Sequence, residues 1–340
     1  MTIKHTVVLD HYGDYVGLEG RRLMIKSKDE VKYVPIDEIE SLLFTNMQSS
    51  ISLKALSALL EAGAGLSILN RGQSDICSVS PKPAHALQMN AIQHRWRENG
   101  IGTRLAKKVI VDKGWHQKRL VYEMMRRAQF KKLTTRQQQH IEKSYQQLDH
   151  TLSSIKHAHL PDFEYEQFLF THEAQMAKAY WKAIAAWLPQ ELNFRGRRLQ
   201  GDTPDPFNAA LNYGYAILAT RITHQLSGLG FDPHLGFLHA DQPPRMSMTY
   251  DVIERYRQRF VDVPLLKYCF SHPCWELNDQ DRLPKSVKQE ISECILQALD
   301  PRSPQGMALI IEDCQKLRQA LLQQKTWQTT ALSRKGLAPL

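Results

Sequence analysis

The first candidate for a catalytic residue is a glutamate that the sequence places on the apolar face of an expected helix. Glu173 falls on the apolar stripe of an expected helix at 170–188, in line with Tyr180, Ile184 and Trp187. A carboxylate on an apolar helix face costs on the order of several kcal/mol to desolvate unless it is paired, protonated or bound to a cation. We therefore expect a partner for Glu173. It could be an arginine, a metal ion, or the helix N-terminus, because Glu173 would lie in the first turn.

A second group of such residues lies between positions 236 and 255. His239 follows a glycine and two apolar residues, and Asp251 and Glu254 come twelve and fifteen residues later. On an expected helix these two carboxylates are neighbours, and because like charges repel we expect a cation beside them. Imidazole with two or three carboxylate oxygens suits Mg²⁺ or Mn²⁺ better than a structural zinc site. The sequence therefore predicts one divalent ion with open coordination positions.

The positive charge of the chain is concentrated in one segment. Residues 95–136 hold thirteen lysines and arginines against three acidic residues, and the whole 340-residue chain has a formal charge of +9. Apolar residues at Leu105, Val109, Trp115 and Leu120 predict a helix with the bases on its solvent faces. A solvated face is one interpretation, but a polyanion would relieve the repulsion between so many like charges. We expect contact with a nucleic acid through Arg95, Arg97, Arg104, Lys107, Lys108 and Lys113.

Composition limits the class of protein. With 42% hydrophobic and 23% charged residues, the chain is neither collagen-like nor wholly disordered. No apolar run approaches the roughly 18 residues that a membrane span needs. The five cysteines form no CxxC pair, which is typical of reduced thiols. We expect a cytoplasmic protein with no membrane partner.

The order of the patterns predicts an α+β multidomain protein. Residues 1–85 are expected to form a small β-rich domain, with a helix that Ser52 opens and Gly63 ends. The β-prone runs lie at 6–9, 22–25, 31–36, 41–44 and 66–69. A proline-containing linker at 78–86 leads to a larger all-α domain at 86–325, and residues 326–340 are expected to be a flexible tail. Later helices are expected at 205–228, 249–261, 285–299 and 306–323.

A hard divalent ion beside a phosphate-attracting surface indicates phosphodiester chemistry. The ion would polarise a phosphoryl oxygen while lysines and arginines hold the strand. No rival chemistry is indicated, since the sequence contains no GxSxG, no P-loop pattern and no GxGxxG after a strand.

Three runs of residues carry a resemblance to a known family. They are LLEAGAGLSILNRG at 59–72, PFNAALNYGYAILATRI at 206–222 and GLGFDPHLGFLHADQPPRMSMTYDVIERYR at 228–257. Together they closely resemble the CRISPR-associated adaptation integrases, the Cas-one family. The resemblance covers nearly the whole chain. Asn212 and Tyr213 fall in the LNYGY element, either against the active site or as packing residues, and Asn90 stands where the family often has an arginine, for which Arg95 or Arg97 could substitute.

The resemblance implies a function and its partners. Members are homodimers joined through the β domain, they assemble with the small partner Cas-two, and they join the 3′-hydroxyl ends of a DNA prespacer to a CRISPR repeat. The metal ligands implied for this chain are Glu173, His239 and Glu254, with Asp251 as a supporting acidic residue. Two other functions remain open. One is a non-catalytic basic DNA-binding scaffold, in which Glu173 and His239 satisfy each other, and the other is a metal-dependent nuclease in DNA repair.

Overall fold

The computed structural model shows two compact units, and successive segments of the chain belong alternately to one and the other. The β-containing unit comprises residues 1–95, 215–250 and 299–331, and the helical unit comprises residues 96–214, 251–298 and 332–340. The expected fold class is confirmed, because a β-rich N-terminal region is followed by helices. The structure describes residues 4–28, 30–69, 76–81, 83, 86–96, 100–128, 133–197, 205–238, 246–273, 275–279, 282–300, 302–303, 305–323 and 325–329.

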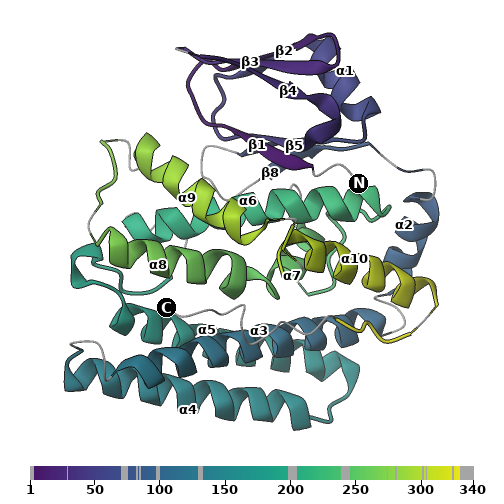
Figure 1. The fold of residues 1–340 in the computed structure, drawn as a ribbon. Coiled ribbons are helices and arrows are strands. Elements are labelled where there is room, and N and C mark those ends of the chain that lie inside the picture. The colour runs from purple at the N-terminus through teal and green to yellow at the C-terminus, as the bar shows by residue number, and fades with distance from the viewer. Residues whose placement is uncertain are drawn as a thin grey trace. The chain divides into compact units, whose positions relative to one another are not determined.

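Two four-stranded sheets make up the first part of the β-containing unit (Figure 1). The strands are β1 His5–Leu9, β2 Tyr15–Glu19, β3 Arg22–Lys26, β4 Val31–Pro35, β5 Ile39–Phe44, β6 Ser50–Ile51, β7 Gly65–Leu69 and β8 Ile76–Val79. One sheet has the order β1-β5-β7-β8, with the first three strands parallel, and the other has the order β4-β3-β2-β6. The predicted strands are confirmed, whereas β2, β6 and β8 were not predicted. The linker expected at 78–86 therefore starts too early, inside β8.

Helix α1 (Leu53–Glu61) begins as the sequence predicts. The Ser52 hydroxyl accepts a hydrogen bond from the backbone N–H of Ala55 at 3.2 Å, which satisfies one of the N–H groups that a helix start leaves without an intrahelical partner. The buried face of α1 carries Ala55 and Leu59, and these residues join the apolar core of the sheets.

The β-containing unit also holds α2 (Ala86–Arg95), α10 (Met307–Leu322) and the C-terminal part of α6 (Pro206–Gly228). A buried polar network ties α6 to the first sheet. Arg221 pairs with Glu40 of β5 at 2.6 Å and donates a hydrogen bond to the Thr6 hydroxyl of β1 at 2.9 Å. Both charges are buried, so each depends on the other for compensation.

Three long helices dominate the helical unit (Figure 1). Helices α3 (Ile101–Arg127), α4 (Thr135–His157) and α5 (Asp162–Trp187) pack against one another. The predicted stripe on α5 is confirmed at Tyr180, Ile184 and Trp187, all of which are buried. The α5 helix starts eight residues before the predicted helix, so Glu173 lies in its middle and not in its first turn.

The remaining helices include one clear error of prediction. Helices α9 (Lys285–Ala298) and α10 match their predicted positions. The single helix expected at 249–261 is wrong. Helix α7 (Ser247–Ile253) ends at Ile253 and a turn follows. A π-helix at Gln258–Asp262 then leads into α8 (Val263–Ser271). None of the described helices has the length and apolarity that a membrane span requires.

Candidate active site

Helix α3 places a lysine in the interior of the helical unit. Its buried stripe includes Leu105, Val109 and Leu120, and Lys113 falls on the same stripe with only 7% of its surface exposed. This position differs from the expectation that every base of the segment would lie on a solvent face. Trp115, which was expected in the stripe, is instead 37% exposed.

Two glutamates from distant parts of the chain meet at the Lys113 ammonium. Its Nζ lies 2.6 Å from Glu173 Oε1 of α5 and 2.8 Å from Glu254 Oε2, in the turn after α7. The other oxygen of Glu254 lies 2.6 Å from the Nη1 atom of Arg257. Because oxygens from both carboxylates contact one nitrogen, they are close enough to share a single cation. Two carboxylates and two cations also leave this cluster without net charge.

The protonation state of Lys113 follows from these contacts. Burial by itself lowers the pKa of Lys113, but the negative charges of Glu254 and Glu173 outweigh that effect and the pKa is raised. Lys113 is therefore an ammonium ion at neutral pH. The partner that Glu173 needs is a lysine of another helix, and not the arginine or helix N-terminus expected from the sequence.

A second charged group lies beside the first on α3. Arg255 pairs with Asp112, and Lys108 lies 2.9 Å from the same carboxylate. Burial, together with the positive charges of Arg255, Arg119 and other nearby bases, lowers the pKa of His116 to about 3, so its imidazole is neutral.

The structure brings together only some of the predicted metal ligands. Glu173 and Glu254 converge on Lys113, while Asp251, one turn earlier, is fully buried. Among the described residues, Asp251 does not form a three-ligand group with these two glutamates. His239 lies outside the described residues, as does Arg97 of the predicted DNA-binding set.

The other predicted DNA-binding residues differ in exposure. Arg95 and Arg104 are exposed, and Lys107 and Lys108 are half-buried. Lys113 is engaged by two carboxylates, so it presents no ammonium to solvent. A feature that the sequence analysis missed is the contact between the exposed Trp115 ring of α3 and the half-buried Arg119, whose guanidinium lies 5.2 Å from the ring centre. Exposed aromatic rings next to arginines are typical of nucleic-acid surfaces.

The LNYGY element shows packing contacts. The Tyr213 hydroxyl lies 2.9 Å from the Ser292 hydroxyl of α9, in the buried interior. The Asn212 side-chain oxygen accepts a hydrogen bond from Arg197 at 2.8 Å. Of the two interpretations of this element, packing is the one with observed contacts.

The β-containing unit holds a different group that could bind a metal ion. Asp10, His11 and Asp14 follow β1, and their ligand atoms lie within 4.8 Å of one another. The His11 Nδ1 atom is 2.9 Å from Asp10, and Asp14 accepts from the Ser27 hydroxyl at 2.7 Å. These contacts also explain the group without a metal ion, because they stabilise the turn after β1.

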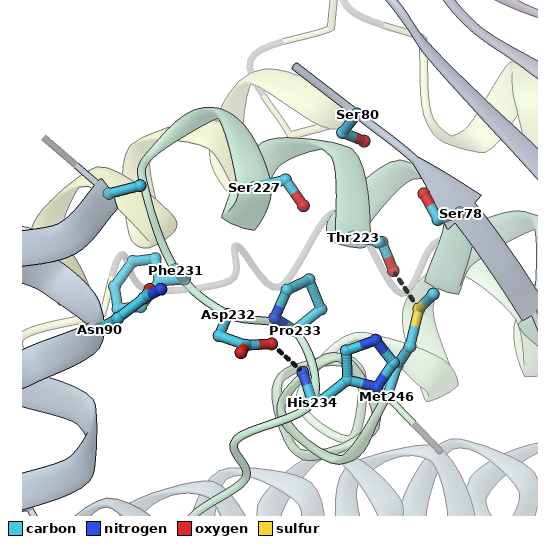
Figure 2. Close-up of a pocket in the computed structure, with 11 residues that line it drawn as sticks. Ser78, Ser80, Asn90, Thr223, Ser227, Phe231, Asp232, Pro233, His234 and Met246 are labelled. Carbon is cyan, nitrogen blue, oxygen red and sulfur yellow. Dashed lines mark hydrogen bonds between the residues drawn. The ribbon is translucent and has the colours of Figure 1, made fainter. Parts of the chain in front are cut away.

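A polar cavity of about 220 Å³ lies in the same unit (Figure 2). Among its described lining residues only Asp232 and His234 are titratable, and the remaining polar atoms come from hydroxyls and Asn90. Gln93 holds this turn in place, because its side chain accepts from the Asp232 N–H at 2.7 Å and donates to the Asp232 carbonyl at 3.0 Å. With its amide turned to donate, Asn90 reaches the Gly230 carbonyl at 3.0 Å.

The structure is that of an α+β protein whose helical unit brings two carboxylates to one ammonium, and comparisons with known proteins identify its family. The sequence model of the family described as CRISPR associated protein Cas1 matches residues 7–273. The chain belongs to the Cas1 family. The predicted resemblance is thereby confirmed.

Individual relatives extend the match over most of the chain. A CRISPR-associated endonuclease Cas1 of Korarchaeum cryptofilum is 29% identical over 265 residues, which are 75% of this chain and 76% of that protein. A casposase bound to its integration product has the same fold, with a TM-score of 0.80 at 20% identity over 98% of this chain and 96% of that one. In a Cas6-RT-Cas1–Cas2 complex, one chain gives a TM-score of 0.79 at 16% identity, over 98% of this chain and 36% of that one.

Proposed function

We propose that this protein is a metal-dependent DNA integrase and endonuclease of CRISPR adaptation. The observation that carries the proposal is the convergence of Glu173 and Glu254 on one cation position, in a member of the Cas1 family. The relative from Korarchaeum cryptofilum is named an endonuclease, and the casposase is bound to an integration product, which supports phosphodiester chemistry for this chain.

The site residues fit a hard divalent cation. Carboxylate oxygens that already converge on a positive charge are the donor set that Mg²⁺ and Mn²⁺ prefer. Glu173 and Glu254 would hold the ion, His239 is the proposed third ligand, and Asp251 is a supporting acidic residue. The bound ion would stabilise the charge that develops on a phosphoryl oxygen.

The proposed reaction is a transesterification. The 3′-hydroxyl oxygen of a DNA prespacer attacks a phosphorus atom at the border of the CRISPR repeat, and a new P–O bond forms. The P–O bond to the 3′ oxygen of the repeat strand breaks, and that oxygen leaves and takes up a proton. One phosphodiester replaces another, so no external energy source is needed. With water as the attacking group the same site acts as an endonuclease.

DNA and protein partners follow from the charge distribution and the family. Arg95, Arg104, Lys107 and Lys108, with Arg97, are the proposed phosphate contacts. One similar chain comes from a complex that contains Cas2, and we propose the same partner for this protein. We further propose a homodimer joined through the β-rich domain at 1–85, followed by the helical catalytic domain at 86–325. The flexible tail expected at 326–340 starts too early, because Trp327 is buried and its indole N–H donates to the Asp313 carbonyl of α10 at 3.0 Å. Residues 330–340 lie outside the described residues.

Paired substitutions test the enzymatic assignment. Glu173→Gln and Glu254→Gln should abolish strand transfer into a supercoiled, repeat-bearing plasmid assayed with Cas2. DNA binding should persist, because neither change removes a base. Glu166→Gln is the matched control, since Glu166 is an exposed carboxylate on the same helix as Glu173. Wild-type strand transfer by either site variant would refute its assignment as a ligand.

One observation favours a non-catalytic scaffold as the second candidate. Lys113 and Arg257 already neutralise Glu173 and Glu254, so the helical unit does not need a metal ion for its charge balance. Calorimetric titration with Mn²⁺ at neutral pH separates the two candidates. An enzyme should lose Mn²⁺ binding when Glu254 is replaced by glutamine, whereas a scaffold should show the same Mn²⁺ binding with and without that substitution.

A further inference from the structure

We propose that Lys113 is a built-in counter-ion that competes with the divalent metal for Glu173 and Glu254. The inference rests on the proposed function, because it takes these two glutamates to be metal ligands. Lys113 acts here as a positioning residue, which holds the carboxylates when the metal is not bound.

The geometry puts the ammonium where a shared cation would have to bind. The Nζ atom of Lys113 contacts one oxygen of each glutamate, at 2.6 Å and 2.8 Å. The two carboxylates come from α5 and from the turn after α7, so no local backbone constraint holds them together. The side chains are also sheltered, with 9% of Lys113, 15% of Glu173 and 3% of Glu254 exposed. Lys113 therefore keeps the pair in register within a water-poor interior.

The charge balance then opposes metal binding. Glu173 and Glu254 carry two negative charges, and Lys113 and Arg257 already compensate them. A divalent ion would add two positive charges next to an ammonium that burial leaves poorly screened. An ion that takes the position of the ammonium between the two glutamates must displace Lys113 from at least one of the oxygens that it contacts. Arg257 contacts the other oxygen of Glu254, so it can stay in place.

Two consequences follow for the protein without DNA. First, the metal-free site is ordered and stable, since every charge in it has a partner. Second, the affinity for the metal ion is held down by the cost of displacing Lys113.

A single substitution separates this inference from a purely structural role of the lysine. Lys113→Met keeps the length of the side chain and removes its charge. The matched control is Lys118→Met, on the same helix, where the ammonium pairs with Asp149 at 2.7 Å but is partly exposed. The measurements are Mn²⁺ affinity by calorimetry and the Mn²⁺-induced shift of the thermal unfolding midpoint, both without DNA.

We expect Lys113→Met to unfold at a lower temperature than wild type in the absence of metal. We also expect it to bind Mn²⁺ at least about tenfold more tightly than wild type, because a nearby positive charge has been removed, and to gain more thermal stability from Mn²⁺. Lys118→Met should match wild type in both respects. A Lys113→Met protein that binds Mn²⁺ no more tightly than wild type would overturn the inference. If that variant does not fold without metal, Lys113→Gln, which keeps a hydrogen-bond donor, is expected to show the same gain, and equal affinity there overturns the inference as well.

Glu254→Gln distinguishes failure of this inference from failure of the proposed function. If wild type and Glu254→Gln bind Mn²⁺ equally, the metal site itself is wrong. If Glu254→Gln loses Mn²⁺ while neither Lys113 variant gains affinity, the metal site stands and only the competition by Lys113 is refuted.

Discussion

Gly114 fixes how closely α3 approaches its two neighbours beside the charged cluster. A Cβ atom added at this glycine would lie 2.6 Å from Met176 Sδ of α5 and 3.1 Å from Leu152 Cδ1 of α4. Both neighbours are buried, at 0% and 1% exposure. Because Gly114 adjoins Lys113 and Met176 is three residues from Glu173, this close approach also sets the contact between that lysine and that glutamate.

The substitution Gly114→Ala brings two opposing effects. Replacing glycine by alanine inside a helix stabilises it by about 1 kcal/mol. Overpacking a well-filled core costs about 1 to 3 kcal/mol, and the thioether of Met176 can move only partly because it is buried. We expect a net loss of about 1 kcal/mol in the free energy of unfolding. Gly228→Ala, at the last residue of α6, is the control, since a Cβ there meets nothing within 4 Å, and it should be neutral or stabilise the protein by up to about 1 kcal/mol.

Urea unfolding of a double-mutant cycle checks the cause of the loss. Met176→Ala removes the atoms that the new methyl group meets, so alanine at position 114 should be less harmful, or even stabilising, in that background. We expect a coupling free energy of at least about 0.5 kcal/mol between the two sites. Additive effects of the two substitutions, or a Gly114→Ala protein more stable than wild type, would refute the packing argument.

Two further predictions concern charge. Burial and nearby bases lower the pKa of His116 from 6.5 to about 3, so protons bind the unfolded chain first as the pH falls. The contribution of the neutral His116 to the free energy of unfolding should therefore be complete above pH 6.5. As the pH drops below 6.5, the free energy of unfolding should decrease by up to about 1.4 kcal/mol per pH unit. His116→Gln should flatten this dependence, measured by urea unfolding between pH 6.5 and 5. An unaltered slope would contradict it. Replacing Arg104, Lys107 and Lys108 together by glutamine should lower the slope of log affinity for duplex DNA against log salt by up to about 2.7, whereas Lys316→Gln on α10 should not change it. An unchanged slope in the triple variant would mean that these bases do not contact phosphates.

Local signals in the sequence were sufficient for several elements. The helix predicted from 205 onward is confirmed, and Asp205 caps it, because its carboxylate accepts from the Asn208 N–H at 2.9 Å while Pro206 occupies the first turn. Ser52 caps α1 in the same way, and both effects act within four residues. The strand β2 was missed because its run is short and Gly17 interrupts its β-prone residues.

The break after α7 could not be predicted from periodicity. Asp251 and Glu254 were expected side by side on one continuous helix, yet the helix ends between them at Ile253. Nearly every residue from 251 to 263 is buried although six of them are charged, so the alternation of apolar and polar residues does not report which face of this segment is buried. The π-helix at Gln258–Asp262 makes a tertiary contact that local sequence does not encode, because the Tyr180 hydroxyl of α5 donates a hydrogen bond to Asp262 at 2.6 Å.

Lys113 shows what the charge pattern of a sequence can and cannot establish. Counted with its neighbours, it belongs to a basic run and suggests a DNA contact. Counted by helical spacing, it lies four residues after Val109 and seven before Leu120, on an apolar stripe. Glu173 was recognised by that spacing rule, and the same rule applied to lysines would have found its partner. Two opposite charges on the apolar stripes of different helices each cost several kcal/mol alone, on the order of a desolvated ion, so their pairing is the expected outcome. A buried glutamate therefore does not by itself imply a metal ion. The metal is favoured here because a second carboxylate, from a distant turn, contacts the same ammonium, so the two carboxylates are placed to share one cation.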